Sequence, residues 1–400
     1  MEPVNLSLVT TAGIPAFHVM AKPTGAQCNL ECEYCFYLRK DGLYPNSNFR
    51  MSIDTLEAFI FQTIQAHRVP EVTFSWQGGE PTLMGLDFFR RAVQMENQFA
   101  KPGMRIENTF QTNGVLVDEE WCRFFYENDF LVGLSLDGPR LLHDAYRHDK
   151  SGRSVFDSVV RAAKLLKKHS VRLNILCTVN AVNCLHPHDV YRFFRDEIGV
   201  LYIQFIPIVE PCHETGAGQA ARMSDHTVDP ERYGRFLNDI FDEWMRCDVG
   251  SVFILFFESV LASYLNAGST LCLLSPICGE AVALEHTGDV YSCDHFVEPR
   301  FFLGNIHREP MADLVSSEMQ RRFGRAKSET LPVRCRECRF LFTCFGECPK
   351  NRVLISPEGE PGLNWLCAGL QAFFEHVDVP MRSMAKLLRQ GRSAVEIMNA

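Results

Sequence analysis

The chain contains the stretch Cys28-Asn-Leu-Glu-Cys32-Glu-Tyr-Cys35-Phe-Tyr, which brings three cysteines together on one short segment. A structural zinc site would need a fourth ligand to close its tetrahedron. The nearest histidines, His18 and His67, fall on an expected strand and an expected helix. Three thiolates with one vacant place suit an iron–sulfur cube whose fourth iron stays open to another ligand. The stretch therefore predicts an oxygen-sensitive cluster with one iron available for chemistry.

Strand-like and helix-like segments alternate through the first two-thirds of the chain. The strand-like apolar runs are residues 17–21, 72–76, 109–112, 130–136, 173–179 and 202–208. Helical stripes lie between them, and Ser52, Asp118 and Ser154 are candidate N-caps. Two further helices are expected over residues 187–196 and 230–245. Six such alternations predict an α/β fold with a parallel sheet, either open or curled into a partial barrel.

Polar and glycine motifs follow the first four expected strands. They are the cysteine stretch itself, Gln77-Gly-Gly-Glu80, Asn113-Gly and Asp137-Gly. One Gly-Gly or Asp-Gly pair alone is typical of a turn. Ligands of parallel α/β folds gather at the carboxyl ends of the strands. Four motifs at that edge therefore indicate a cofactor site.

Composition excludes several classes of protein. The 400 residues are 46% hydrophobic and 22% charged, which excludes global disorder. The net charge of −9 argues against a nucleic-acid partner. The longest apolar run, residues 252–265, is interrupted by Glu258 and is too short for a membrane span. No basic leader precedes the first apolar residues, so we expect a cytoplasmic protein with no membrane partner.

Sixteen cysteines are many for such a chain, and most of them are grouped. Beyond the first three, eight more gather near the C-terminus, namely Cys272, Cys278, Cys293, Cys335, Cys338, Cys344, Cys348 and Cys367. Eight thiolates are enough for two complete iron–sulfur clusters. A pair of zinc knuckles is the alternative, for which Cys335 and Cys338 alone would be good support. The remaining five, Cys122, Cys177, Cys184, Cys212 and Cys247, are interpreted as small buried hydrophobic residues.

The pattern changes near residue 266, where regular periodicity gives way to Cys, Gly, Pro and Arg. We therefore expect a first domain over residues 1–265, a cysteine-rich domain over 266–369 and a helical segment over 370–400.

The motifs resemble those of a known superfamily. Cys28–Cys35 followed by Phe36 and Tyr37 is similar to the signature of radical S-adenosylmethionine (SAM) enzymes, which have a partial (β/α)6 barrel. The motif from Gln77 to Pro81 resembles their strand-end loop, which binds the SAM amino group, where glycine lets the backbone approach the ligand. The cysteine-rich end resembles the SPASM extension, which holds two auxiliary clusters.

The resemblance implies SAM and three 4Fe–4S clusters as cofactors. One auxiliary cluster would take Cys272, Cys278, Cys293 and Cys348, and the other Cys335, Cys338, Cys344 and Cys367. SAM would be contacted by Tyr34, Gly78, Gly79, Glu80, Ser135, Arg147 and Val209. The guanidinium of Arg147 suits the SAM carboxylate, although an arginine alone is more typical of a surface salt bridge.

The whole pattern is most similar to anaerobic sulfatase-maturating enzymes. That family oxidises a Cys or Ser of a sulfatase polypeptide, within a Cys/Ser-x-Pro-x-Arg motif, to formylglycine. Its general base corresponds to Asp294, which would take the thiol or hydroxyl proton while an auxiliary cluster takes an electron. An Asp in that place is otherwise usually a turn residue. A flavodoxin- or ferredoxin-type donor would supply electrons; the extreme N-terminus and residues 210–229 match nothing in the family.

Two alternatives stay open at this point. The first is another SPASM enzyme that forms thioether or carbon–carbon crosslinks in a ribosomal peptide. Many of those carry a leader-binding domain, and only 27 residues precede Cys28. The second is a non-catalytic iron–sulfur carrier or zinc scaffold, which would bind no SAM. The preference between Cys and Ser, the client sulfatase and the oligomeric state are not readable from the sequence.

Overall fold

The fold comes from a computed structural model that describes residues 16–212, 222–269 and 271–399. Part of the unmatched loop, residues 213–221, lies outside the described residues. The chain forms two compact units. The first comprises Met1–Leu134, His148–Leu173 and Gly279–Gly324, and the second Ser135–Arg147, Asn174–Cys278 and Arg325–Ala400. Neither unit is continuous in sequence.

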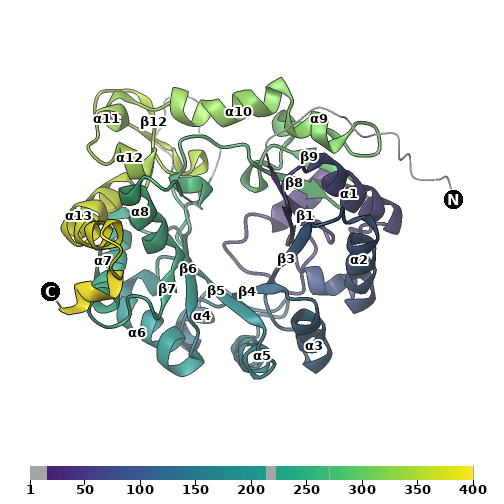
Figure 1. The fold of residues 1–400 in the computed structure, drawn as a ribbon, viewed down its shortest axis with the longest axis horizontal. Coiled ribbons are helices and arrows are strands. Elements are labelled where there is room, and N and C mark those ends of the chain that lie inside the picture. The colour runs from purple at the N-terminus through teal and green to yellow at the C-terminus, as the bar shows by residue number, and fades with distance from the viewer. Residues whose placement is uncertain (1–15, 213–221, 270, 400) are drawn as a thin grey trace. The chain divides into compact units, whose positions relative to one another are not determined.

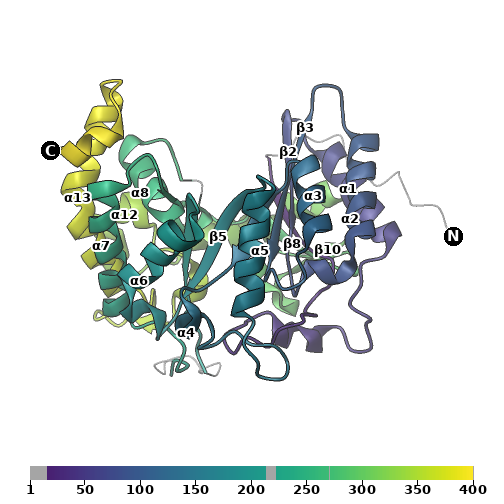
Figure 2. The same ribbon diagram turned by 90° about the horizontal axis from the view of Figure 1, so that it is seen from below.

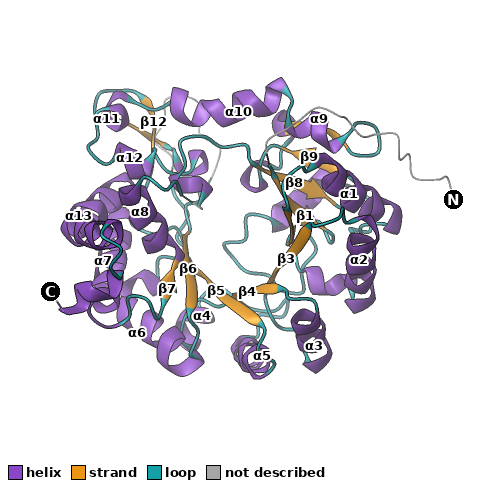
Figure 3. Cartoon of the chain, viewed as in Figure 1, coloured by secondary structure: helices purple, strands orange, loops and turns teal. Residues whose placement is uncertain are grey.

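The first unit is built on four parallel strands in chain order (Figures 1 and 3). They are β1 His18–Lys22, β2 Glu71–Trp76, β3 Arg105–Thr112 and β4 Leu131–Ser135. The sequence predicted all four within a few residues. Trp76, Phe89, Phe110 and Phe125 meet ring to ring in the core that the strands share with their helices. Buried aromatic rings of this size supply most of the apolar area that stabilises such a core.

Helices α1 Ile53–Ala66, α2 Leu86–Phe99, α3 Glu119–Glu127 and α5 Phe156–Lys168 accompany these strands. Figure 2 shows α1, α2 and α3 along one side of β2 and β3. Ser52 and Asp118 accept hydrogen bonds from the first turns of α1 and α3, so both predicted caps are confirmed. Ser154 lies one residue before the N-cap Val155 of α5, and its hydroxyl accepts from Phe156 N at 3.3 Å.

Three strands from the cysteine-rich region complete the first unit. They are β8 Ala281–Glu285, β9 Asp289–Tyr291 and β10 Phe302–Asn305, and the order along the sheet is β10-β9-β8-β1-β2-β3-β4. β8 pairs with β1 in parallel, which places Glu285 beside Lys22 at the carboxyl ends of the two strands. The residues that follow β8 are thereby brought to the edge where the first cysteine stretch begins.

The second unit contains β5 Arg172–Val179, β6 Tyr202–Pro207 and the short β7 Phe253–Ile254, all parallel. Its helices are α4 Arg140–His143, α6 Pro187–Arg192, α7 Pro230–Cys247, α8 Leu255–Leu265 and α13 Cys367–Arg389. α13 packs against α7 and α8, which confirms that the tail is helical. The helix expected over residues 187–196 continues past α6 as a π-helical turn, Phe193–Ile198.

The cysteine-rich region consists of short elements. They are η5 Cys272–Leu274, α9 Met311–Val315, α10 Glu318–Glu329, α11 Val333–Arg336, α12 Leu341–Cys344, η8 Pro349–Asn351 and the hairpin of β11 Leu354–Ile355 with β12 Pro361–Leu363. Short elements bury little apolar area of their own. No helix in the described part of the chain is long and apolar enough to cross a membrane.

The scattered cysteines are only partly what the sequence predicted. Cys122, Cys177 and Cys184 are buried, as expected for small hydrophobic residues. Cys212 is half-buried and Cys247 is exposed, so the prediction is wrong for these two. Cys247 is the last residue of α7, and a residue at a helix end can lie outside the buried stripe.

Candidate active site

The loop after β1 carries Cys28, Cys32 and Cys35, all half-buried. Its turns are held by main-chain hydrogen bonds, including Cys35 N to Cys32 O at 3.0 Å. The amide of Leu30 donates to the sulfur of Cys28 at 3.3 Å. The three thiols are therefore carried by an ordered loop at the carboxyl end of a parallel strand.

The glycine motif after β2 packs directly onto this loop. Gly79 N donates to Gly25 O, and Glu80 N donates to Gln27 O, each at 2.8 Å. A Cβ at Gly79 would lie 1.8 Å from the Gln27 carbonyl oxygen, where no side chain fits. Gly78 has a φ of +112°, a conformation that favours glycine. Position 79 therefore requires glycine because its backbone lies against the loop that carries Cys28.

Glu80 joins the ends of β2 and β3. Its buried carboxylate accepts hydrogen bonds from Thr82 N and Oγ1, from Thr112 Oγ1 and from Asn113 N, at 2.7–3.0 Å. Burial raises the pKa of Glu80, and these donors oppose the rise. The carboxylate of Glu80, a residue predicted to bind SAM, is therefore engaged in hydrogen bonds that connect the loops after β2 and β3.

The environment of Cys28 favours the neutral thiol. Burial, followed by the charge of Glu80, raises the pKa of Cys28 to about 12. The amide of Asn113 lies 3.6 Å from its sulfur. Iron binding must therefore displace a proton from Cys28, because the thiolate is the metal ligand.

Among the described residues, no three His, Cys, Asp or Glu side chains converge on a point that would hold a single metal ion. A 4Fe–4S cube makes no such demand, because each of its thiolates binds a different iron atom. Three thiols on one loop, with the backbone folded tightly behind them, fit a cube of this kind.

Asp294 stands opposite a buried lysine. It begins the short turn Asp294–Phe296, and its carboxylate forms an ion pair with the ammonium of Lys22, the last residue of β1. The side chains are 15% and 2% exposed, respectively. The ammonium of Lys22 also lies 4.4 Å from the ring centre of Tyr37, a cation–π contact. Phe36 packs on His295 with ring centres 5.0 Å apart, so the Asp294 turn also contacts the cysteine loop.

A buried polar network supports this pair. The hydroxyl of Tyr37 donates to Glu285, whose other oxygen lies 3.0 Å from His286 Nδ1. His286 Nε2 lies 2.6 Å from the hydroxyl of Ser47. Burial, and then the charge of Glu285, raise the pKa of Tyr37 well above its ordinary value, so the phenol stays protonated.

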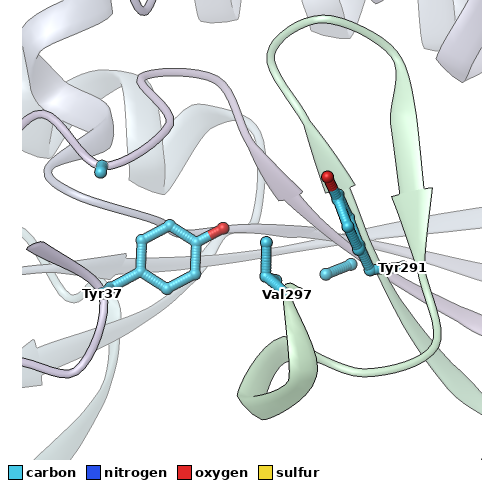
Figure 4. Packing of buried hydrophobic residues seen from close by; sticks show 5 residues of the cluster. Tyr37, Tyr291 and Val297 are labelled. Atoms are coloured by element: carbon cyan, nitrogen blue, oxygen red, sulfur yellow. The ribbon is translucent and has the colours of Figure 1, made fainter. Parts of the chain in front are cut away.

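An apolar cluster surrounds the network. Tyr37 packs there with Ala26, Ala283, Tyr291 and Val297, and Figure 4 shows the two tyrosines on either side of Val297. An ion pair next to such a cluster is weakly screened by solvent and keeps a defined geometry.

The second unit holds Arg147, the residue predicted to bind the SAM carboxylate. Arg147 is 7% exposed, and its Nε donates to Asp137 Oδ2 at 2.8 Å. The alternative interpretation of Arg147, a surface salt bridge, is therefore wrong, since the pair is buried. Asp137 Oδ1 accepts from Thr178 N and Oγ1. Burial is the largest single effect and favours the neutral acid, but the charges of Arg147 and His143, with the hydrogen bonds from Arg147 and Thr178, together lower the pKa of Asp137.

The other predicted SAM contacts lie at strand ends or in loops. Ser135 is the last residue of β4, and Tyr34 is buried in the cysteine loop. Val209 is fully buried just after β6. Its neighbour Ile208 donates to the Val179 carbonyl at 2.9 Å, which ties the end of β6 to the end of β5.

In the second unit, several of the C-terminal cysteines are neighbours of one another. Cys335 packs in one apolar cluster with Cys367, and its electrostatic neighbours include Cys338. Burial and then the charge of Glu347 raise the pKa of Cys344 to about 12. The charges of Cys367 and Cys335 add to this rise. Cys278 likewise interacts with Cys272. Cys293 belongs to the first unit, directly before Asp294.

Two parts of the site were missed in the sequence. Lys22 could have been suspected, because a lysine that ends an apolar strand is seldom buried without a partner. Glu285 lies 263 positions further along and has no local signal, because only its pairing with β1 brings it beside Lys22. Asp137 was noted as part of a strand-end motif but was given no role.

Comparison with protein families agrees with this geometry. A model of the Radical SAM superfamily matches residues 23–186. A model of the SPASM iron–sulfur cluster-binding domain matches residues 276–339.

Individual proteins match over nearly the whole chain. A serine-type anaerobic sulfatase-maturating enzyme of Bacteroides thetaiotaomicron is 45% identical over 96% of this chain and 94% of its own length. A cysteine-type enzyme of Clostridium perfringens is 32% identical over 91% of this chain and 96% of its own. The solved structure of native anSMEcpe with AdoMet and a peptide bound has a TM-score of 0.83 at 32% identity, over 94% of this chain and all of that one. Streptococcus suis SuiB, at 15% identity and a TM-score of 0.59 over 88% of this chain and 77% of its own, shares the fold.

Proposed function

This chain belongs to the anaerobic sulfatase-maturating enzymes, and we propose on that premise that it oxidises a Ser or Cys side chain of a sulfatase polypeptide to formylglycine. The observation that carries the proposal is the ion pair of the half-buried Asp294 with the buried Lys22, next to the cysteine loop. The pair supports the proposal because a carboxylate held in a fixed position can accept a substrate proton.

The proposed cofactors are SAM and three 4Fe–4S clusters. Cys28, Cys32 and Cys35 would hold the cluster that binds SAM, and the eight C-terminal cysteines would hold the two auxiliary clusters in the sets given above. When bound, these groups supply the one-electron chemistry, namely a 5′-deoxyadenosyl radical that removes a hydrogen atom and an acceptor for one electron. The grouping of Cys335, Cys338, Cys344 and Cys367 supports the assignment of one auxiliary set.

Asp294 is the proposed general base. After the β-carbon of the substrate has lost a hydrogen atom, the hydroxyl or thiol proton passes to the Asp294 carboxylate, and one electron leaves the substrate. A serine then becomes the aldehyde directly, and a cysteine becomes a thioaldehyde that water hydrolyses with release of hydrogen sulfide. Lys22 holds the carboxylate of Asp294 in place before the proton arrives.

SAM is proposed to contact the strand-end residues, among them Tyr34, Gly78, Gly79, Ser135 and Val209. Arg147 would direct its fork at the SAM carboxylate while Asp137 fixes the orientation of the guanidinium. Because the carboxylate of Glu80 is engaged with Thr82, Thr112 and Asn113, we assign Glu80 a supporting role in the shape of this site.

The domain division is proposed as residues 1–265, 266–369 and 370–400. The two family matches, over residues 23–186 and 276–339, fall inside the first and second of these domains and support it. The pairing of β8 with β1 shows that the cysteine-rich segment also adds strands to the sheet of the first unit.

The proposed substrate motif is Cys/Ser-x-Pro-x-Arg, and the proposed electron donor is a flavodoxin- or ferredoxin-type protein. The higher identity to the serine-type relative, 45% against 32% for the cysteine-type one, favours serine as the better substrate.

The test is an anaerobic assay of the reconstituted enzyme with paired Ser and Cys peptides of this motif. Conversion of Cys to formylglycine removes about 18 mass units, whereas a crosslink removes about two. The aldehyde from either peptide is confirmed with a hydrazide probe. A mass loss of two from the Cys peptide, with no hydrazide adduct, would instead support the crosslinking alternative.

The matched variant is Asp294→Ala. We expect 5′-deoxyadenosine to form while the aldehyde yield collapses, because the substrate proton has lost its acceptor. A full aldehyde yield from this variant would remove Asp294 from the role of base.

A further inference from the structure

The cysteine-rich region contains a lysine with almost no contact with solvent. Lys327, on α10, is 1% exposed. Its ammonium donates to the carbonyl oxygens of Cys272 and Leu273 at 2.7 and 2.9 Å. Lysine is almost never fully buried unless a partner compensates its charge. The carbonyl oxygens satisfy its donors but carry no net charge.

A second cation lies beside it. The guanidinium of Arg352, which is half-buried, donates to the carbonyl oxygen of Lys327 at 2.6 Å. It also donates to the carbonyls of Phe345 and Gly346, each at 3.0 Å. A Cβ at Gly346 would lie 2.7 Å from Arg352 Nη2, so the glycine leaves room for the guanidinium. Backbone carbonyl oxygens therefore hold the guanidinium of Arg352 in a defined position.

Both cations act on proposed cluster ligands. Burial lowers the pKa of Lys327, and the charges of Cys278, Cys272 and Cys348 oppose this effect. Burial likewise lowers the pKa of Arg352. The charges of Cys335, Cys278, Glu347 and Cys348 oppose this effect. Cys278 and Cys348 are therefore neighbours of both cations, Cys272 is a neighbour of Lys327, and Cys335, from the other proposed set, is a neighbour of Arg352.

One buried carboxylate, Glu347, also acts on both side chains. It accepts from the amides of Asn351 and Asn364 at 2.9 and 2.6 Å, and burial raises its pKa. One carboxylate, held by two amides, thus faces two cations. The three side chains together carry an excess of one positive charge.

A cluster held by four thiolates carries net negative charge, which grows by one on reduction. A fixed positive charge nearby in a medium of low dielectric constant stabilises the reduced form more than the oxidised form. Such charges around the ligands are one of the means by which a protein sets the reduction potential of a cluster.

We propose that Lys327 and Arg352 are tuning residues that raise the reduction potential of the auxiliary cluster held by Cys272, Cys278 and Cys348, so that it accepts the electron released by the substrate. This inference rests on the proposed function for the source of the electron. The effect on the potential is a property of the chain and its cluster alone. One electron leaves the substrate radical, one reduces the cluster, and the accompanying proton goes to Asp294.

The test compares reconstituted wild type with Lys327→Gln, which retains a donor for the two carbonyls but has no charge. Midpoint potentials are measured without peptide by redox titration with electron paramagnetic resonance detection. We expect a more negative potential for one auxiliary cluster in Lys327→Gln, a further decrease on adding Arg352→Gln, and no change in Lys327→Arg. The matched control is Arg325→Gln on the same helix, an exposed cation whose loss should leave all potentials unchanged.

A wild-type potential in Lys327→Gln with full iron content would overturn the proposal. So would loss of iron from both neutral variants while Lys327→Arg retains it, since that result assigns the lysine to cluster retention. With peptide present, Lys327→Gln should form less formylglycine per 5′-deoxyadenosine than wild type. If wild type makes no formylglycine at all, the proposed function fails, and the potentials still decide the role of Lys327.

Discussion

The ammonium of Lys22 and the carboxylate of Asp294, 272 positions apart in the chain, form an ion pair between a buried and a half-buried side chain. Removing Asp294 would leave the buried charge of Lys22 without this partner; in a fully buried pair such a loss costs about 3–5 kcal/mol. Lys22 therefore helps to set the position of Asp294.

We expect Lys22→Met to uncouple the reaction. The carboxylate of Asp294 loses its anchor, so formylglycine per 5′-deoxyadenosine should fall by about tenfold or more in the folded fraction, whereas Lys22→Arg should recover part of it. The ratio of the two products, measured by liquid chromatography, reports this directly. Arg90→Met, which removes an exposed ion pair with Asp87, is the control and should leave the ratio unchanged. An unchanged ratio in Lys22→Met would reduce Lys22 to a structural role.

Gly79→Ala should prevent assembly of the first cluster. The added methyl would lie 1.8 Å from the Gln27 carbonyl oxygen, so the loop that carries Cys28 must move. We expect about four fewer irons per chain than in wild type, determined by iron and sulfide analysis after anaerobic reconstitution. Gly42→Ala is the matched control, because a Cβ there meets nothing within 4 Å. Wild-type iron content in Gly79→Ala would show that the loop has room to spare.

The stability of the first unit should depend on pH through Glu96. Burial raises the pKa of Glu96 to about 7, although Asn108 donates to it. A carboxyl with a raised folded-state pKa contributes most stability below its unfolded pKa of about 4.5 and loses that contribution as pH rises through about 7. Between pH 5 and 8 the loss approaches about 3 kcal/mol.

Glu96→Gln should therefore lose less stability than wild type between pH 5 and pH 8, measured from urea denaturation midpoints. The exposed Glu127→Gln serves as the control and should follow the wild-type slope. Parallel slopes for wild type and Glu96→Gln would mean that Glu96 is ionised in the fold at both pH values.

Arg147→Lys should weaken SAM binding. Lysine keeps the charge beside Asp137 but cannot pair with two carboxylates through a planar fork, so we expect about a tenfold higher Kd. Equilibrium dialysis of SAM against the reconstituted enzyme measures this. The exposed Arg153→Lys, which pairs with Asp149, should bind SAM as wild type does. Equal affinity in Arg147→Lys would limit Arg147 to its pairing with Asp137.

Much of the architecture could be predicted because its signals are local. The six strand–helix alternations, the caps at Ser52 and Asp118 and the helical tail are all written in short stretches of sequence. The sequence was a poor guide where burial and contacts depend on residues that are distant in the chain. The sequence cannot show that Arg147 is buried against Asp137, that Cys247 is exposed, or that Gly79 is needed for contact with Gln27.

The amino-acid sequence by itself determined which cofactors this protein is expected to bind, because cysteine spacing and strand-end motifs are properties of neighbouring residues. Only the tertiary structure decided which charges meet. The parallel pairing of β8 with β1 brings Glu285 to Lys22, and the turn after β9 brings Asp294 to the same lysine. The physical reason is that a buried charge is stable only beside a partner, and a partner hundreds of residues away is chosen by packing rather than by spacing.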